Sequence, residues 1–430
     1  MIVIEKEKTT KAVYSAYKDS GVDWLGEVPA HWEVVKMKYL FKDYSEKGKP
    51  EAELLSVTQS QGVVPRSWVA TRMVMPSGNL ESFKFIAKGD FAISLRSFEG
   101  GLEYCHHDGI ISPAYTVLRA RRKIEDGYYK YLFKSPTFIS ELQTSVVGIR
   151  EGKNISYPQL SYSFMPIPPL PEQRRIADYL DQKCAQIDLA IAQKERMIAL
   201  LEERQQIVIQ RAVSQGLDSG VEMKDSGVAW LGEIPESWEV LKIRDLMQLK
   251  SDKGHPDYEV LSVYREYGVI PKSSRDDNHN ATSLDTSTYK AVKPGDFVIN
   301  KMKAWQGSMG VSNYKGIVSP AYITCEVDTS KIYSRYLHNL LRCKKYISEY
   351  NRISYGVRIG QWDIRFEDFK QLPLLLPPME EQIFISNIID EVVSKTARAV
   401  LDQRKGIKAL REYREVLIDE VVRGRMCLGE

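Results

Sequence analysis

A long internal duplication constrains the fold of this chain more than any other feature of its sequence. The segment KDSGVDWLGEVPAHWEVVKMKYL begins at Lys18. It recurs 206 residues later as KDSGVAWLGEIPESWEVLKIRDL, with 15 of 23 positions identical. Shorter matches follow in the same order: KGDFAIS and PGDFVIN, GIISPAY and GIVSPAY, PPLPEQ and PPMEEQ. Repeats of this length are whole domains rather than solenoid units. The sequence therefore predicts two copies of one fold, related by a pseudo-twofold.

Each copy has the same order of predicted elements. A tryptophan-rich opener leads into short strand patterns separated by Gly, Asp and Pro turns, a short helical stretch follows, and a long helix closes the copy. We predict an α+β protein: two mixed α/β domains in a pseudo-twofold arrangement, separated by a long antiparallel two-helix coiled coil. The predicted bounds are 1–170 for the first domain, 171–216 for the first helix, 217–378 for the second domain and 379–424 for the second helix.

The closing helices carry a coiled-coil pattern, because apolar residues recur in alternating steps of four and three. In the first helix, where Pro171 suits the first turn, these positions are Leu180, Cys184, Ile187, Ile191, Lys194, Ile198, Leu201, Gln205, Val208 and Ala212. In the second they are Ile389, Val393, Thr396, Val400, Gln403, Ile407, Leu410, Arg414, Leu417 and Val421. The alternative is two amphipathic helices on a globular core. Their length of roughly 65 Å, at 1.5 Å per residue, favours the coiled coil.

The short connection between the copies predicts that the two helices pair antiparallel. The first helix ends near Gln215 and the second opener begins at Gly227. The dozen residues between them span at most about 40 Å. A parallel pair would require the chain to return along most of the helix before the second domain began.

Composition limits the classes of protein that fit. The chain of 430 residues has 43% hydrophobic and 27% charged residues, so it can bury cores, and its net charge of +3 permits a polyanionic partner without requiring one. The five cysteines form no CxxC pair, which favours a reducing cytoplasm and argues against a structural zinc. The N-terminus lacks the pattern of a secretory signal, and no apolar run approaches the length of a membrane span. We expect a soluble cytoplasmic protein.

The sequence contains no recognisable catalytic motif. It lacks a phosphate-binding GxxxxGK[ST] loop and the patterns GxGxxG, HExxH and GxSxG. The CHH run at Cys105–His107 has only SN as its counterpart in the second copy, and its spacing suits no tetrahedral metal site. We therefore predict no catalytic residue, no metal site and no cofactor on this chain. The opener residues Trp24, Leu25, Val28, Pro29 and Trp32 are predicted to form an apolar clasp at the helix end.

The loops that differ between the copies are the candidates for DNA contacts. They hold Arg, Lys, Asn or Gln beside glycine or an aromatic residue, and these side chains can bond to base edges or phosphates. A solvated surface charge is the alternative at each position. The candidates are Arg66, Arg96, Arg150, Lys153, Asn154, Arg265, Lys272, Arg275, Lys301, Lys303, Arg358 and Gln361. A shared frame with different loop chemistry suggests one scaffold that reads two different DNA words.

Two copies of DSGV-WLGE-P--WEV, each followed by a variable domain and then by PPLPEQ or PPMEEQ before a long helix, resemble the specificity (S) subunit of type I restriction-modification systems. The resemblance covers nearly the whole chain. It implies two target-recognition domains that each read half of a bipartite, asymmetric site in double-stranded DNA. The helices would act as a ruler and as a docking surface for two methyltransferase (M) subunits, which restriction (R) subunits join. S-adenosylmethionine, ATP and Mg would belong to those partners, and the S subunit itself would be non-catalytic.

Two other functions remain as alternatives at this point. One is a stand-alone DNA-modifying enzyme, which would need a cofactor or metal motif. The other is a coiled-coil scaffold without DNA readout of its own, which the small net charge favours.

Overall fold

The computed structural model describes residues 13–69, 80–147, 154–275, 282–283, 285–356 and 362–429. The chain divides into two compact units, Met1–Lys194 with Arg404–Glu430 and Glu195–Gln403. Each unit holds one copy of the repeated domain together with half of each long helix.

The domain of the first unit is built on a four-stranded antiparallel sheet in the order β4–β11–β8–β9. Two-stranded pairs surround it: β1–β2, β3–β14, β5–β6, β7–β10 and β12–β13. The strands are β1 (Tyr17–Asp19), β2 (Glu27–Pro29), β3 (Glu33–Lys36), β4 (Phe41–Tyr44), β5 (Leu55–Thr58), β6 (Gly62–Pro65), β7 (Lys84–Ile86), β8 (Phe91–Ile93), β9 (Glu103–Tyr104), β10 (Gly109–Ile111), β11 (Thr116–Ala120), β12 (Val146–Val147), β13 (Asn154–Ile155) and β14 (Phe164–Ile167). The short helices are α1 (Ser97–Gly100), α2 (Asp126–Leu132), α3 (Pro136–Thr144), α4 (Tyr157–Leu160), η1 (Met37–Tyr39), η2 (Arg66–Trp68) and η3 (Leu80–Ser82).

The second unit repeats most of this plan, and its described residues hold no strand pair that corresponds to β12–β13. Its sheet has the order β18–β25–β22–β23, and the pairs are β15–β16, β17–β26, β19–β20 and β21–β24. The strands are β15 (Met223–Asp225), β16 (Glu233–Pro235), β17 (Glu239–Lys242), β18 (Met247–Leu249), β19 (Leu261–Tyr264), β20 (Gly268–Pro271), β21 (Lys290–Val292), β22 (Phe297–Ile299), β23 (Met309–Val311), β24 (Gly316–Val318), β25 (Ile323–Val327) and β26 (Pro373–Leu376). The short helices are α6 (Ser334–Leu340), α7 (Lys344–Ile353), α8 (Phe366–Phe369), η4 (Ile243–Asp245), η5 (Lys272–Ser274) and η6 (Lys301–Gln306).

A repeated Gly-Asp turn leads into a strand of each four-stranded sheet, β8 in the first unit and β22 in the second. Gly89 adopts φ +89° between β7 and β8, and the buried carboxylate of Asp90 accepts a hydrogen bond from the amide of Ala87. Arg119 on β11 neutralises this carboxylate at 2.6 Å. A buried carboxylate needs such a partner, so the turn and the sheet are tied together.

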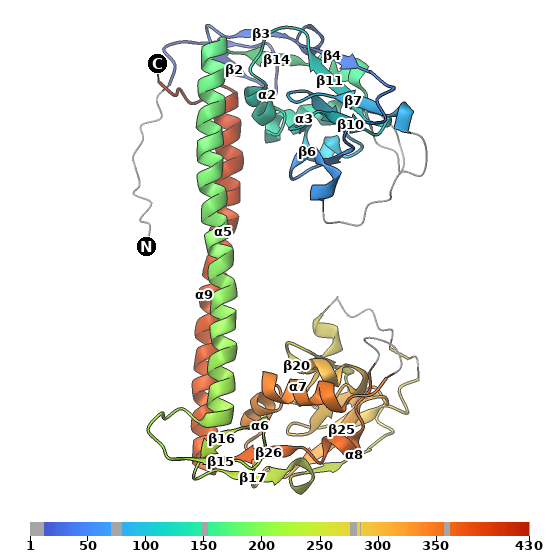
Figure 1. The fold of residues 1–430 in the computed structure, drawn as a ribbon, viewed down its shortest axis with the longest axis vertical. Helices are drawn as coiled ribbons and strands as arrows, with labels where there is room; N and C mark the ends of the chain where they lie inside the picture. Colours follow the sequence, from blue (N-terminus) through green and yellow to red (C-terminus); the bar gives the residue numbers. More distant parts are fainter. Residues whose placement is uncertain are drawn as a thin grey trace. The chain divides into compact units, whose positions relative to one another are not determined.

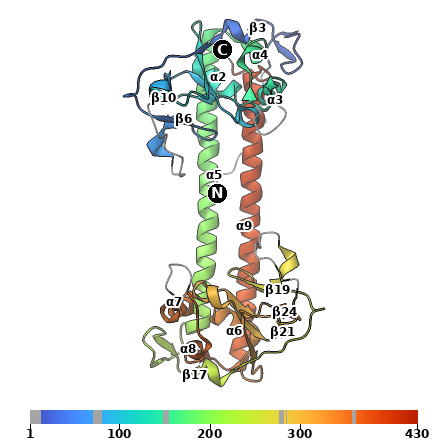
Figure 2. The ribbon, with the colours of Figure 1, turned by 90° about the vertical axis from the view of Figure 1, so that its right-hand side faces the viewer.

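The two long helices are α5 (Leu170–Gln215) and α9 (Met379–Val422), as the apolar repeat predicts. They pack against each other in both units (Figures 1 and 2). In the first unit Arg414 pairs with Asp188 at 2.8 Å, while Gly406 faces Lys194. In the second unit Gly216, which follows α5, faces Glu381 at the start of α9. Partners advance along one helix as they recede along the other, so the antiparallel prediction is confirmed.

Burial follows the predicted apolar seam. All ten seam positions of α5 are buried or partly buried, and nine of ten in α9 are. Val393 is the exception, with 38% of its surface exposed. Other faces of the helices carry exposed side chains such as Leu189 and Glu195. The coiled-coil interpretation is therefore correct in its register, with one position out of line.

Each opener seats its domain on the helices of its own unit. Trp32 is fully buried, and its Nε1 donates to the carboxylate of Glu172 in the first turn of α5 at 3.0 Å. Gly424, just after α9, has φ +72°, and a Cβ there would lie 2.5 Å from the Pro29 ring. Only glycine allows this contact. The main chain of Val422 accepts a hydrogen bond from Tyr128.

The second unit makes the equivalent seat. Trp238 is fully buried and donates to Glu381 at 3.0 Å, and Tyr336 donates to the carbonyl of Val213 near the end of α5. Gly216 has φ +78° beside Trp238. The clasp predicted from the openers is thus confirmed, and the PPLPEQ and PPMEEQ motifs supply its carboxylates.

Within the described part of the chain, no helix is both long enough and apolar enough to cross a membrane.

Candidate nucleic-acid interface

In the first unit, a tight turn between β5 and β6 carries the first candidate loop. Thr58 donates through its hydroxyl to the carbonyl of Gly62 and accepts from the amide of Gln61, both at 3.0 Å. Gly62 has φ +73°, and a Cβ at that position would approach the Tyr104 carbonyl to 2.5 Å. The turn therefore has a fixed backbone, and it presents the exposed side chains of Gln59 and Gln61.

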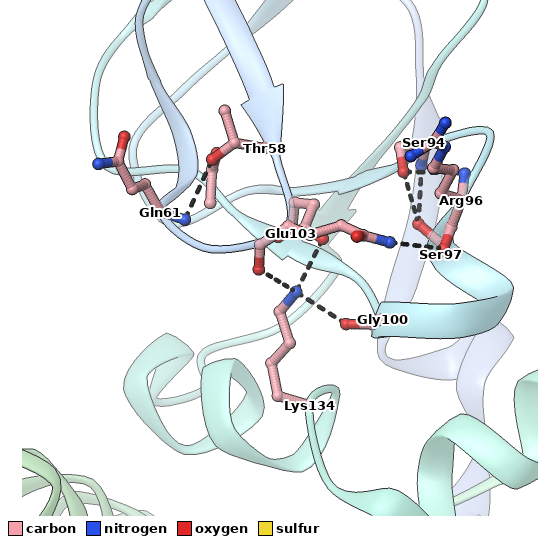
Figure 3. Close-up of polar contacts among 10 residues, drawn as sticks. Thr58, Gln61, Ser94, Arg96, Ser97, Gly100, Glu103 and Lys134 are labelled. Carbon is pink, nitrogen blue, oxygen red and sulfur yellow. Dashed lines mark hydrogen bonds and ion pairs between the residues drawn. The ribbon is translucent and has the colours of Figure 1, made fainter. Parts of the chain in front are cut away.

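The segment before α1 lies beside this turn. Ser97 accepts a hydrogen bond from the amide of Ser94, which fixes the bend on which Arg96 is exposed. Gln59 donates to the carbonyl of Arg96 at 3.3 Å. Leu95 is 52% exposed at the same bend. Figure 3 shows Thr58, Gln61, Arg96 and Ser97 in one polar cluster.

The hairpin β12–β13 packs against α1 through β13. Asn154 begins β13, so the structure brings its backbone next to the segment that carries Arg96. The side chain of Asn154, together with Arg150 and Lys153, lies outside the described residues. Of the three segments that hold DNA-contact candidates in this copy, the structure therefore brings together the one with Arg96 and the one with Asn154.

Arg66 lies apart from this cluster. It begins η2 at the far end of β6 from the turn, and its amide donates to the carbonyl of Leu54. Two residues on, Trp68 is 61% exposed and packs edge-on against His107, with ring centroids 4.9 Å apart. The described residues do not place Arg66 and Arg96 in one contact set.

The second unit presents different chemistry on the same frame. Arg265 is exposed in the β19–β20 turn. Arg275 lies over the ring of Tyr267, at 4.7 Å from its centroid, and Tyr267 is 49% exposed. Lys272 begins η5 and donates to the hydroxyl of Thr282 at 2.6 Å.

The element η6 holds two further candidates, Lys301 and Lys303. Lys303 is exposed, whereas Lys301 pairs with Asp363 at 2.5 Å and accepts from the amide of Ile364 through its carbonyl. Trp305 packs against Trp362, with ring centroids 5.0 Å apart. Arg358 and Gln361 lie outside the described residues.

Sequence reasoning missed one cation in each copy. Lys134, after α2, donates to the carbonyl of Gly100 at 2.8 Å and pairs with the buried carboxylate of Glu103 at 2.7 Å (Figure 3). Arg342 is its equivalent after α6, and it donates to the carbonyl of Arg265 at 2.6 Å. The available signal was a cation kept 208 positions apart in an otherwise divergent helical stretch.

Burial shifts the ionisation of these groups. Loss of water raises the pKa of Glu103, against the pull of Lys134. Burial, and then the charge of Arg342, lower the pKa of His338 to about 3. His338 is therefore neutral at pH 7, which allows its Nε2 to accept a hydrogen bond from Arg342.

The CHH run does not assemble as a ligand set. The Cys105 thiol is buried and donates to the carbonyl of His107 at 3.0 Å, and burial raises its pKa to about 12. Among the residues that the structure describes, no three His, Cys, Asp or Glu side chains gather as metal ligands.

The fold and these loops define a class of protein: a two-domain recognition protein in which one α+β scaffold occurs twice, each copy seated on a shared helix pair and presenting its own polar loops.

Comparison with known proteins shows which family the chain resembles. The protein-family model for the type I restriction modification DNA specificity domain matches residues 235–403. The type I restriction enzyme MjaVIII specificity subunit of Methanocaldococcus jannaschii is 25% identical over 382 residues, which covers 83% of this chain and 84% of that protein. The chain is therefore similar to type I restriction-modification specificity (S) subunits, to the family model over residues 235–403 and to a known subunit over most of its length.

Solved structures agree with the fold. The crystal structure of the HsdS subunit from Thermoanaerobacter tengcongensis has a TM-score of 0.54 at 16% identity, covering 93% of this chain and 98% of that chain. A chain from a study of complex assembly and conformational transition of the type I R-M system has a TM-score of 0.66 at 16% identity, covering 93% and 99%. These likenesses concern the fold alone.

Proposed function

We propose that this chain is the non-catalytic DNA-recognition subunit of a type I restriction-modification complex, and that it reads a bipartite, asymmetric site in double-stranded DNA. Each domain recognises one half of the site through its own loops, and the helix pair sets the unspecific gap between them. The observation that carries the proposal is the twofold use of one scaffold and one seat with different loop chemistry on each copy. A protein that bound one uniform target twice would have no reason to carry different polar residues in corresponding loops.

The loop chemistry supports a duplex DNA target. Arg96 projects from the segment before α1 in the first unit, Arg265 projects from the β19–β20 turn in the second, and Lys303 and Arg275 add positive charge in the second unit. Arginine and lysine bind phosphates and guanine edges, while glutamine and asparagine bind adenine edges. These residues carry the recognition in this proposal, together with the candidates in the loops around 150 and 360.

The partners follow from the family. Two M subunits dock on the helices and R subunits join them, while S-adenosylmethionine, ATP and Mg are held by those subunits rather than by this chain. The cytoplasm is the proposed compartment, and the five cysteines, all free thiols, are compatible with a reducing one.

The test is DNA binding and methyl transfer with and without M subunits. The purified chain is incubated with labelled S-adenosylmethionine and genomic DNA, alone and with its M subunits, and the complex is footprinted on the modified fragments. The proposal predicts methylation only with M subunits and two protected patches separated by a fixed gap. Methylation by the chain alone would support the enzyme alternative. Methylation with no protection that depends on this chain would support a scaffold.

A further inference from the structure

In the first copy, one partly buried cation joins three segments of the candidate interface. Nζ of Lys134 donates to the carbonyl of Gly100 at 2.8 Å and to the carbonyl of Gln59 at 3.4 Å, and it pairs with Glu103 at 2.7 Å. Gln59 belongs to the β5–β6 turn, and Gly100 ends the α1 segment that carries Arg96. One ammonium group therefore bonds to the main chain of both segments.

In the second copy, the equivalent cation holds the equivalent turn. Nη2 of Arg342 donates to the carbonyls of Arg265 at 2.6 Å and of Glu266 at 2.9 Å. Arg265 stands at the same place in the repeat as Gln59. Nη1 of Arg342 donates to Nε2 of His338, one helical turn earlier.

The groups that surround the cation differ between the two copies, whereas a cation is present at this position in both. The first copy supplies an acceptor from β9, the carboxylate of Glu103. The second copy has Gly310 at that position and fills the space with the ring of His338, which a Cβ on Gly310 would approach to 2.9 Å. Lys130 stands where the second copy has His338, and it points to Asp181 instead, at 2.6 Å. Both copies therefore keep the bond from the cation to the turn, although the groups around the cation differ.

We infer that Lys134 and Arg342 are positioning residues for DNA recognition: each clamps the recognition turn of its own domain (residues 59–61 and 265–267) and so sets which base pairs that domain accepts. The inference rests on the proposed function. Neither cation is assigned direct contact with DNA, because Nζ of Lys134 is engaged by two main-chain carbonyls and Glu103, and the two terminal nitrogens of Arg342 are engaged by two main-chain carbonyls and His338. The clamp orients the exposed side chains on the turn. A small shift of the turn would place these side chains against different groups on the base edges.

A purely structural role makes a different prediction. Loss of a cation needed only for folding would lower activity equally at all DNA sites. Loss of a clamp would relax the choice of bases in one half of the site and leave the other half unchanged, because each clamp bonds only within its own domain.

The experiment uses the chain in complex with its M subunits, and the readout is the map of methylated adenines in cells that carry each variant. Lys134→Met and Arg342→Met remove the clamps, and Lys134→Arg and Arg342→Lys retain a cation. Because Lys134→Met leaves Glu103 buried without its cation, Lys134→Met/Glu103→Gln removes both charges and serves if the single variant does not fold. Glu103→Gln alone keeps both carbonyl bonds. Lys130→Met is the matched control, one turn earlier on α2 and paired with Asp181.

We expect each clamp variant to change base discrimination in only one half of the DNA site. Lys134→Met, or the double variant, should reduce discrimination against single-base changes in one half of the site by about three- to tenfold, a part of the usual cost of a mismatched base pair. Arg342→Met should do so in the other half. Lys134→Arg and Arg342→Lys, which retain a cation, should keep wild-type discrimination. Glu103→Gln and Lys130→Met should keep it as well. Equal loss at all sites, or unchanged discrimination in both clamp variants, would overturn the clamp. A wild-type complex whose methylation shows no two-part site would instead overturn the proposed function.

Discussion

At the scale of single residues, the two seats use the same tryptophan–carboxylate bond but support it differently. Glu172 accepts from Tyr14, His31 and Trp32, at 2.5, 2.8 and 3.0 Å, and only 6% of it is exposed. Glu381 accepts from Trp238 and is more exposed. The first seat therefore holds a buried carboxylate with three donors, and the second seat a single bond from tryptophan.

Removing each carboxylate is expected to have unequal cost. Glu172→Ala leaves the buried indole of Trp32 and the partly buried hydroxyl of Tyr14 without this acceptor, and we expect it to destabilise the first unit by about 2–3 kcal/mol. Glu381→Ala is expected to cost about 1 kcal/mol in the second unit. Hydrogen exchange of amides in each unit under rising denaturant measures the two values separately. Equal losses would show that the Tyr14 and His31 contacts add nothing.

His338 gives the second unit a dependence on pH. Its ordinary pKa of 6.5 falls to about 3 in the folded chain, mainly through burial. Between these values the unfolded chain binds a proton that the folded chain does not, so stability falls as the pH drops from 6.5 toward 3. The slope is at most about 1.4 kcal/mol per pH unit.

His338→Gln is expected to reduce the change of the melting temperature of the second unit with pH. The first unit, with Lys130 at this position, provides the internal comparison. An unaltered slope in the variant would assign the effect to other groups.

At the scale of elements, η6 carries the sharpest prediction about phosphate contacts. Lys301 pairs with Asp363, whereas Lys303 is exposed. Lys303→Ala is expected to lower the slope of log affinity against log salt by about 0.9, the value for one lost phosphate contact. Lys301→Ala is expected to change it less. Titration of the assembled complex with its DNA site at several salt concentrations measures both. Identical slopes for wild type and the double variant would remove η6 from the interface.

The elements also show what the sequence can and cannot predict. The long helices are predictable because a spacing such as Leu180–Cys184–Ile187 is local, and it reports on one face of one helix. The seat was predictable in kind, because two tryptophans recur with the same neighbours. The bond from Lys134 to Gln59 was not, since it joins residues 75 apart that only the folded sheet brings together. The DNA-contact candidates remain predictions, and four of them lie outside the described residues.

At the scale of the whole molecule, the two helices are predicted to set the gap between the halves of the DNA site. Insertion of seven residues into each, after Lys194 and after Gln403, keeps the apolar seam in register. Each insertion lengthens its helix by about 10 Å. At about 3.4 Å per base pair, the gap should grow by up to about three base pairs, with both half-site words unchanged. Methylated-adenine maps of the variant complex give the answer, and the old spacing would exclude the helices as the ruler.

The central claim is that each copy reads its own half of the site. The most direct measurement exchanges residues 41–165 for the equivalent domain of a relative with a different DNA site, keeps the opener, the seat and both helices, and maps methylated adenines in cells that also carry the M subunits. The account predicts that one half of the site changes to the word of the donor, while the other half and the gap stay as they were. A change in both halves, or in neither, would contradict it.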